Sequence, residues 1–575
     1  MTATKPGAQA GSGANADPDY AARRYSSLSR INRDDVHELV PLWTFSTGVL
    51  RGHEGAPLVV GGLLYAHTPF PNTVYALDLA HDGRIVWRYR PVQDPSVAGV
   101  MCCDVASRGL AYDDGLVFLY QADATLVALD AATGAERWRV KNADPADGAT
   151  ATSAPFAARG RVLVGVSGGE YGVRGHMTAY DAKTGKRLWR AYSTGPDADM
   201  RVDPQRTTEL GRPVGRESSL KSWEGDQWRL GGGDPWGRIS YDPELDLVYY
   251  GTGNPSTWNP VQRPGDNKWA TAIVARDLET GVARWLYQMT PHDQWDYDGV
   301  NEMILTDADV DGRRRRLLMH FDRNGFAYML DRESGELLRA DKFDPDANWA
   351  KRIDLDKNSP GYGRPVLDEA FSTEAAGEDT PTRGVCPATV GAKNANPAAF
   401  SPQTGLFYVP LISLCMDFEP FRVSYARGQP YTGADTSVAA PHPGAMGGLL
   451  AWDPVKGAPA WRVGETFPVV SGVLATGGGL VFYGALDGYL KALDARTGEE
   501  RFRFKTPSGI VGDPIAFSFG GKDYVAVLSG VGGWAGAGLT AGLTGTKEGE
   551  NSPEVYAALS AYTTLGGQLT VFGLR

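Results

Sequence analysis

One short pattern, repeated along the chain, constrains the fold more than any other feature. Each copy has an apolar strand end, an Asp, a short turn closed by Gly, and then an aromatic or long side chain. In such a hairpin the Asp caps the turn and the Gly supplies a positive φ before the next strand. The copies are residues 76–87, 128–138, 179–189, 275–285, 329–339, 451–461 and 492–502.

Repeated hairpins predict an all-β fold in which the units stack. Units of this kind cannot bury their apolar faces alone, and four-stranded units close most naturally into a propeller. We expect the Trp of the repeat to pack between neighbouring blades. The long gaps between copies, at 190–274 and 340–450, predict large insertions, which often carry function. The expected inter-blade residues are Trp87, Trp138, Trp189, Trp285 and Trp461.

Composition agrees with short strands and excludes several classes of function. The chain has 575 residues, of which 72 are Gly and 37 are Pro, as expected for many tight turns. It has no run of about 18 apolar residues, so we expect no transmembrane helix. The net charge of −11 and the lack of a basic stripe argue against a nucleic-acid partner.

The first 20 residues are polar and rich in small side chains, and we expect a flexible segment there. They lack the apolar region of a signal peptide, which fits either a cytosolic protein or a processed form. We expect residues 21–575 to form a single propeller domain.

Two of the four cysteines, Cys102 and Cys103, are adjacent. Neighbouring Cα atoms lie about 3.8 Å apart, whereas a relaxed disulfide needs roughly 4.4 to 6.8 Å, so a bond between them would be strained. The alternative is two free thiols. The count of four also fits either two disulfides or none.

Several segments together resemble the pyrroloquinoline quinone (PQQ) dependent alcohol dehydrogenases. They include MCCDVASRGLAY (101–112), YYGTGNPSTWNP (249–260), TPHDQWDYDGVNEMIL (290–305) and GVGGWAG (530–536). The resemblance implies an eight-bladed propeller with the quinone on its axis. Within the family, the chain is most similar to methanol dehydrogenases, and residues 290–305 resemble their lanthanide-using branch.

The resemblance also implies a metal site beside PQQ. Glu170, Asn254 and Asp296 match its ligands, all of them hard oxygen donors such as Ca²⁺ or a lanthanide requires. Asp298 matches the second Asp of the lanthanide branch. Three carboxylates favour a trivalent over a divalent ion by Coulomb attraction, with Ca²⁺ as the alternative. Taken singly, these residues could equally be turn residues or solvated surface charges.

Further matches concern the quinone. The resemblance implies that a disulfide between Cys102 and Cys103 covers one face of PQQ and that Trp236 stacks on the other. It also implies a second disulfide, Cys386 with Cys415, and hence an oxidising compartment, which favours the periplasm. The other residues matched to PQQ contacts are Glu54, Arg108, Thr152, Ser167, Gly168, Gly169, Arg323, Asn394, Gly533 and Trp534.

The chain departs from the family pattern at two positions near the expected quinone. Asp234 replaces a Thr two residues before Trp236, which adds a negative charge, and we count it among the cofactor-binding candidates. Val470 replaces a Trp that many relatives have. These changes bear on the orientation of PQQ and on the size of the pocket.

The resemblance implies oxidation of methanol or another short primary alcohol to an aldehyde, with the metal as Lewis acid. Asp296 would be the general base, and Arg323 would stabilise charge on the quinone oxygen. Trp258 matches a wall of the alcohol pocket. Electrons would pass to a cytochrome c, and a homodimer is possible. The alternatives are a same-fold dehydrogenase for ethanol, aldehydes or bulkier secondary alcohols, and a non-catalytic propeller scaffold, which would not need this set of residues.

Overall fold

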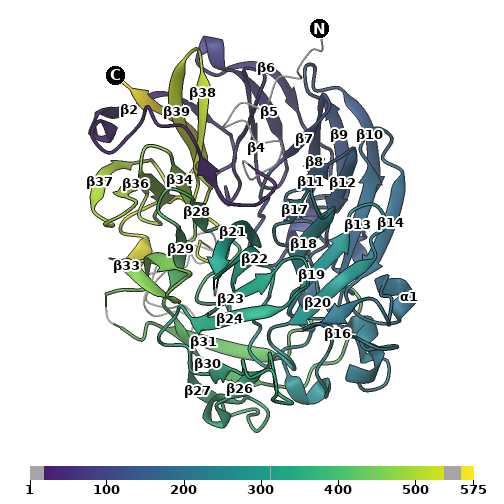
Figure 1. The fold of residues 1–575 in the computed structure, drawn as a ribbon. Helices are drawn as coiled ribbons and strands as arrows, with labels where there is room; N and C mark the ends of the chain where they lie inside the picture. Colours follow the sequence, from purple (N-terminus) through teal and green to yellow (C-terminus); the bar gives the residue numbers. More distant parts are fainter. Residues whose placement is uncertain (1–18, 311, 443, 537–557) are drawn as a thin grey trace.

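The computed structural model describes residues 19–310, 312–442, 444–536 and 558–575 (Figure 1). The predicted flexible segment, 1–20, therefore lies almost wholly outside the described residues. Among the described residues, no helix is both long and apolar enough to cross a membrane.

The described strands form eight four-stranded antiparallel units that follow one another around a ring in sequence order (Figure 1). This agrees with the all-β propeller predicted from the repeats and with the eight blades that the resemblance implies. The units are β3 (Leu58–Val60), β4 (Leu63–His67), β5 (Val74–Asp78) and β6 (Arg84–Tyr89); β7 (Ala111–Asp113), β8 (Leu116–Tyr120), β9 (Thr125–Asp130) and β10 (Glu136–Lys141); β11 (Phe156–Ala158), β12 (Arg161–Val164), β13 (His176–Asp181) and β14 (Arg187–Tyr192); β17 (Ser240–Asp242), β18 (Leu247–Gly251), β19 (Ala272–Asp277) and β20 (Ala283–Gln288); β21 (Ile304–Val310), β22 (Arg313–Phe321), β23 (Phe326–Asp331) and β24 (Leu337–Lys342); β28 (Ala399–Ser401), β29 (Leu406–Ile412), β32 (Gly447–Asp453) and β33 (Ala458–Glu465); β34 (Leu474–Thr476), β35 (Leu480–Gly484), β36 (Tyr489–Asp494) and β37 (Glu500–Lys505); and β38 (Ile515–Phe519), β39 (Lys522–Ser529), β40 (Gln568–Leu574) and β2 (Leu39–Ser46).

Strands from both ends of the chain close the ring. β2 supplies the fourth strand of the last unit by pairing antiparallel with β40, from Leu39 opposite Leu574 to Ser46 opposite Gln568. The short β1 (Tyr25–Ser26) adds to β34 in parallel. An open arrangement would leave unpaired strand edges where the chain begins and ends. Closure by strands from both ends of the chain avoids this.

The Trp of the repeat joins five of the eight blades to the blade that follows. The indole N–H of Trp87 donates to the carbonyl of Ala131, and that of Trp285 donates to the carbonyl of Arg332. Gly134 lies against the Trp87 ring, where a Cβ would come within 2.6 Å of ring atoms, so the turn needs Gly for contact as well as for its φ of +71°. The predicted inter-blade packing is confirmed, since Trp138, Trp189 and Trp461 make the equivalent bonds to Ala182, Leu278 and Ala495.

The two long gaps between repeats contain insertions, as predicted. The first holds α1 (Asp197–Met200), β15 (Thr208–Glu209) and β16 (Arg212–Pro213). The second holds β25 (Ala350–Ile353), β26 (Pro365–Leu367), β27 (Thr382–Val385), β30 (Cys415–Pro420) and β31 (Ala434–Ala439). The predicted disulfide between Cys386 and Cys415 is present and ties the end of β27 to the start of β30.

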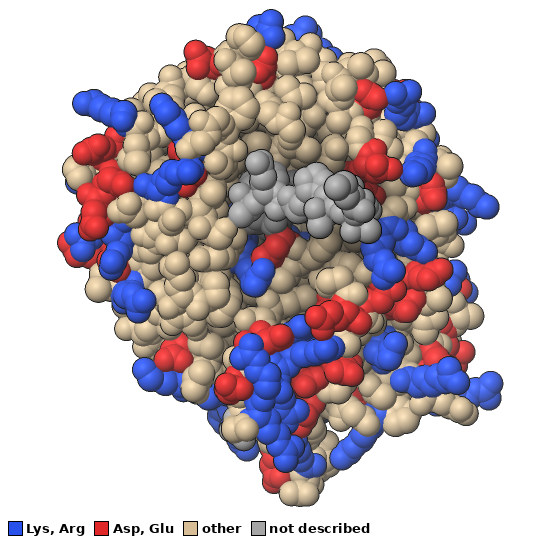
Figure 2. All heavy atoms as spheres, turned by 45° about the horizontal axis from the view of Figure 1, so that its top comes forward, with Lys and Arg blue, Asp and Glu red and all other residues tan. Residues whose placement is uncertain are grey.

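Charged side chains of both signs are intermixed on much of the face shown in Figure 2. In the basic run that begins β22, Arg315 pairs with Glu336 and Arg316 pairs with Glu244. Two of its four arginines are thus paired with acids on neighbouring elements.

Candidate active site

The predicted site residues lie on loops at one end of the blades. In an antiparallel unit, the loop before the first strand and the loop between the second and third strands lie at the same end. Trp236 precedes β17 and Asp296 precedes β21, whereas Asn254 lies between β18 and β19 and Arg323 lies between β22 and β23. The topology therefore brings residues that are far apart in sequence to one end of the ring.

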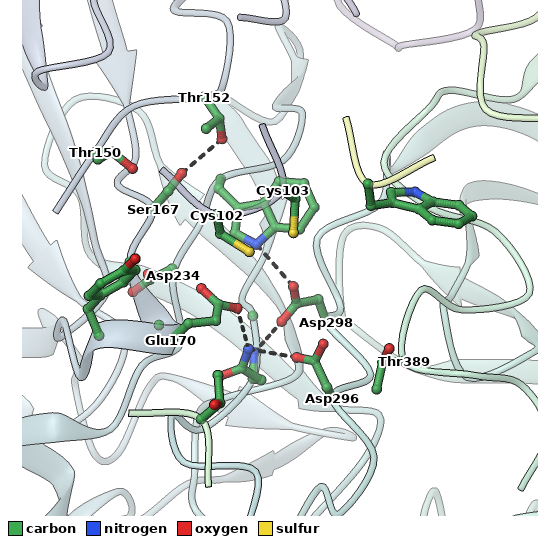
Figure 3. A pocket seen from close by; sticks show the side chains of 18 of the residues that line it. Cys102, Cys103, Thr150, Thr152, Ser167, Glu170, Asp234, Asp296, Asp298 and Thr389 are labelled. Carbon is green, nitrogen blue, oxygen red and sulfur yellow. Dashed lines mark hydrogen bonds between the residues drawn. The ribbon is translucent and has the colours of Figure 1, made fainter. Parts of the chain in front are cut away.

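These loops enclose a cavity of about 310 Å³ (Figure 3). The cavity is lined by Cys102 and Cys103. It is also lined by every other residue predicted to contact the quinone, the metal or the alcohol, with one exception. The exception, Gly533, borders a smaller pocket beside it. The predicted residues that line the main cavity are Glu54, Cys102, Cys103, Arg108, Thr152, Ser167, Gly168, Gly169, Glu170, Asp234, Trp236, Asn254, Trp258, Asp296, Asp298, Arg323, Asn394 and Trp534.

The amide of Asn254 links two of the predicted metal ligands. Its Nδ2 donates to Asp296 Oδ1 at 2.7 Å and to Glu170 Oε1 at 3.2 Å, while its Oδ1 accepts from the backbone N–H of Ser256. The amide hydrogens of Asn254 thus occupy the side of the carboxylates where a bound cation would lie. Ligation by Asn254 would use Oδ1 and would require the amide to rotate.

Asp298 and Arg323 complete the charged floor of the cavity. Asp298 accepts from the indole N–H of Trp236 at 3.1 Å, and Arg323 lies 3.3 Å from Asp298 and 3.5 Å from Asp296. Burial alone would lower the pKa of the Arg323 guanidinium, but the two carboxylates raise it. Arg323 therefore stays a cation, and it faces more negative charge than it can balance.

Burial and mutual repulsion destabilise the carboxylates in their charged form. Burial, followed by the charge of Asp298, raises the pKa of both Glu170 and Asp296. The pKa of Asp234 is raised well above its usual value by burial and by the charges of Glu170 and Asp298. A multivalent cation would reverse this penalty, because it replaces repulsion by attraction.

The predicted ligands are collected in one cavity, but they are not arranged as a finished metal shell. Among the described residues, no group of three His, Cys, Asp or Glu side chains is positioned to hold a metal ion as it stands. The physical reason is visible in the contacts above. The carboxylates of Glu170, Asp296 and Asp298 each lie within hydrogen-bond or ion-pair distance of a nitrogen of Asn254, Trp236 or Arg323.

The predicted disulfide between Cys102 and Cys103 is absent, which corrects the expectation drawn from the resemblance. Both residues are free, exposed thiols at the cavity. The backbone already takes a left-handed conformation there, with φ of +59° at Cys103 and +81° at Asp104. Closing a bond between adjacent residues would add the strain of their short Cα separation to this turn.

Another part of the cavity wall is polar, and its polar side chains pair with one another. Arg108 lies 2.8 Å from Glu54 and stacks its guanidinium 4.8 Å from the centre of the Trp236 ring. Burial raises the pKa of Glu54 even though Arg108 opposes this shift. The hydroxyls of Thr152 and Ser167 share a hydrogen bond of 2.9 Å. These groups offer a flat ring, a cation and hydroxyls along one side of the cavity.

Some lining residues were not predicted from the sequence. Thr150 is two positions from the predicted Thr152, and this alternation in an extended segment was a usable signal. The backbone of the second insertion also reaches the cavity, where the N–H of Tyr431 donates to the carbonyl of Glu170. The sequence indicated an insertion there but not its path. The unpredicted lining residues are Val100, Thr150, Tyr171, Gly253, Thr389, Val390, Pro430 and Thr432.

Val470 lies at the smaller pocket, together with Asn396, Gly533 and Trp534. Its side chain is buried, and its carbonyl accepts from the Asn396 amide at 2.5 Å. The position is therefore next to the main cavity rather than on its wall.

The fold and the site together define a class of enzyme. A family model described as the PQQ-type glucose/ethanol/alcohol dehydrogenase β-propeller domain matches residues 15–340 and 452–525. The chain belongs to this family of PQQ-dependent propeller alcohol dehydrogenases.

Within the family, methanol dehydrogenases are strongly similar to this chain. A lanthanide-dependent methanol dehydrogenase from Methylorubrum extorquens is 60% identical over 97% of this chain and 93% of the relative. Subunit 1 of a methanol dehydrogenase [cytochrome c] from Paracoccus denitrificans is 45% identical over 97% of this chain and 89% of the relative. The solved structure of a europium-containing methanol dehydrogenase is 48% identical, covers 98% of each chain and superposes with a TM-score of 0.93.

Proposed function

We propose that this enzyme oxidises methanol or another short primary alcohol to the aldehyde, with PQQ and a trivalent lanthanide ion as cofactors. The observation that carries the proposal is the charge of the cavity. Glu170, Asp296 and Asp298 lie on one floor and share a single guanidinium, Arg323. A trivalent ion with a preference for hard oxygen donors fits this surplus better than Ca²⁺ does.

The residues that would hold PQQ line the same cavity. Trp236 and the exposed Cys102 and Cys103 supply its flat and apolar surfaces, while Arg108 and Thr152 supply polar contacts at the rim. Glu170, Asn254, Asp296 and Asp298 would hold the ion. When bound, PQQ would supply the acceptor for the hydride that leaves the alcohol, and the lanthanide ion would supply Lewis-acid activation of that acceptor.

The chain itself supplies the proton acceptor and the counter-charge. Asp296 is a buried carboxylate within the cavity, and we assign it the proton of the alcohol hydroxyl. Arg323 is held as a cation next to Asp296 and can stabilise negative charge that develops beside it. Trp258 contributes an apolar wall, which favours a small alcohol.

The test is alcohol oxidation with an artificial electron acceptor, using protein loaded with PQQ and with either La³⁺ or Ca²⁺. We expect turnover with La³⁺ and a loss of that preference in Asp298→Ala. Asp344→Asn is the matched control, because Asp344 is a buried carboxyl that does not line the cavity. Equal turnover with Ca²⁺ and La³⁺ would reject the trivalent assignment, and a panel of larger alcohols then defines the substrate.

The proposal also covers the electron acceptor and the cellular compartment of the enzyme. A relative is named as a methanol dehydrogenase that uses cytochrome c, which supports a c-type cytochrome as the electron acceptor here. The disulfide between Cys386 and Cys415 supports an oxidising compartment such as the periplasm. A homodimer, as the resemblance implies, would be tested by sedimentation of the purified chain.

A further inference from the structure

Asp234 is a buried carboxylate whose charge is poorly compensated. Its side chain lines the cavity and is only 3% exposed, and the backbone N–H of Gly169 opposes only part of the increase in pKa that burial and the neighbouring carboxylates cause. A buried ionised group whose charge is poorly compensated is strongly unfavourable, and in a cavity a bound ligand can satisfy it. Asp234 therefore needs an explanation that the contacts of the described residues do not supply.

The backbone holds Asp234 firmly in this position. Its carbonyl accepts from the N–H of Gly253 and from that of Trp236, both at 3.1 Å. These bonds fix the backbone of the segment that also carries Trp236. The Asp234 Cα is thus positioned by the same turn that places the aromatic ring.

Asp234 lies next to the predicted metal ligands. A Cβ at Gly169 would come 3.2 Å from Asn254 Oδ1 and 3.6 Å from Asp234 Oδ2, so both oxygens face the same small space. Glycine at this position leaves that space open between the Asp234 carboxylate and the Asn254 amide. Figure 3 shows the side chains of Asp234 and Glu170 side by side at the cavity.

We propose that Asp234 is a further cation-binding carboxylate of this cavity and that it increases the preference for a trivalent over a divalent ion. The inference rests on the proposed function, because it concerns the same metal site. With Asp234, five carboxylates and two guanidinium groups line the cavity; because Glu54 is paired with Arg108, four carboxylates remain to oppose Arg323. The surplus of three negative charges equals the charge of a lanthanide ion.

Electrostatics makes the proposal quantitative. The interaction of one carboxylate with an ion scales with the charge of that ion, so its logarithmic contribution to affinity is larger for a trivalent than for a divalent ion by a factor of about 1.5. Removing the Asp234 charge without changing its shape should therefore weaken Tb³⁺ binding about 30-fold and Ca²⁺ binding about 10-fold. A purely steric role would affect the two ions equally.

The experiment uses the full chain loaded with PQQ and stripped of metal with a chelator. Tb³⁺ is titrated while its Trp-sensitised luminescence is recorded, and Ca²⁺ affinity is obtained by competition. The variants are Asp234→Asn and Asp234→Thr, with Asp344→Asn as the matched control for loss of a buried carboxyl outside the cavity. We expect the losses given above for both Asp234 variants and unchanged affinities for the control.

Two experimental results would overturn the inference. Equal losses for Tb³⁺ and Ca²⁺, or unchanged Tb³⁺ affinity with altered PQQ affinity measured by absorbance, would assign Asp234 to shape or to the quinone. Asp298→Asn separates this failure from failure of the proposed function. If Asp298→Asn weakens Tb³⁺ binding and Asp234→Asn does not, only the inference is wrong; if neither substitution matters, both are wrong.

Discussion

The contacts between blades and the cavity follow opposite rules. Between blades, one contact recurs: an indole N–H donates to a carbonyl of the next repeat, as from Trp87 to Ala131 and from Trp189 to Leu278. In the cavity, buried polar atoms lack partners, among them Nε of Arg323 and Nε1 of Trp258.

This difference separates the residues that build the ring from those that act in it. A satisfied contact repeated around a ring stabilises the fold and carries no chemical specificity. Unsatisfied buried groups lower stability, and in a cavity a bound ligand can satisfy them. Substitutions in the two regions should therefore have separable effects on activity and on stability.

The largest effect should come from the cavity. Asp296→Asn keeps the shape of the side chain but removes the proposed proton acceptor, and we expect kcat to fall by about 10⁴-fold. Because the substitution also removes a buried charge that is repelled by Asp298, the midpoint of unfolding should not fall. The checks are dye-linked alcohol oxidation and urea unfolding of the same preparation. Substantial turnover of the variant with both cofactors bound would contradict the role given to Asp296.

The contact between blades should show the reverse pattern. Trp285 is fully buried, and Trp285→Ala should lower the free energy of unfolding by about 4 kcal/mol through the cavity that it leaves. Lanthanide affinity of the protein that remains folded should stay unchanged. Urea unfolding and Tb³⁺ titration measure the two quantities. A variant with wild-type stability would mean that this contact adds nothing to closure of the ring.

The same division explains how much the sequence could predict. The hairpin repeat specified the blades and the Trp contacts because each copy carries its own local signal, such as the Asp and Gly around Trp138. The resemblance to the family predicted most of the residues that line the cavity. It could not place the backbone of the second insertion, which brings Pro430 and Thr432 to the cavity, because no repeat governs that path.

Two details of the site were also beyond the sequence. The metal ligands remain a prediction, and the sequence could not show the orientation of the Asn254 amide, whose nitrogen points at Glu170 and Asp296. The adjacent cysteines were expected to be bonded and are free. In both cases local electrostatics and backbone geometry decide the arrangement, and neither can be deduced from residue identity.

A buried carboxyl outside the cavity gives a smaller, pH-dependent effect. Burial raises the pKa of Asp344 to about 6, above the usual value of 3.8. Between these values the folded chain binds more protons than the unfolded chain, so the Asp344 contribution to stability falls as pH rises from about 4 to about 6, by about 3 kcal/mol in all. Asp344→Asn, which keeps an oxygen for the N–H of Asp346, should remove this dependence. Urea unfolding at pH 4, 5, 6 and 7 compares the two proteins, and parallel curves would contradict the shift.

The smallest effect isolates one hydrogen bond between blades. Trp87→Phe keeps an aromatic ring against the Gly134 turn but removes the indole N–H that donates to Ala131. The loss should be about 1 kcal/mol for the bond, together with a minor loss of packing. Trp138→Phe is the matched variant, because its indole makes the equivalent bond to Ala182 from a more exposed position and should cost less. Equal losses at the two positions would show that burial does not set the strength of this contact.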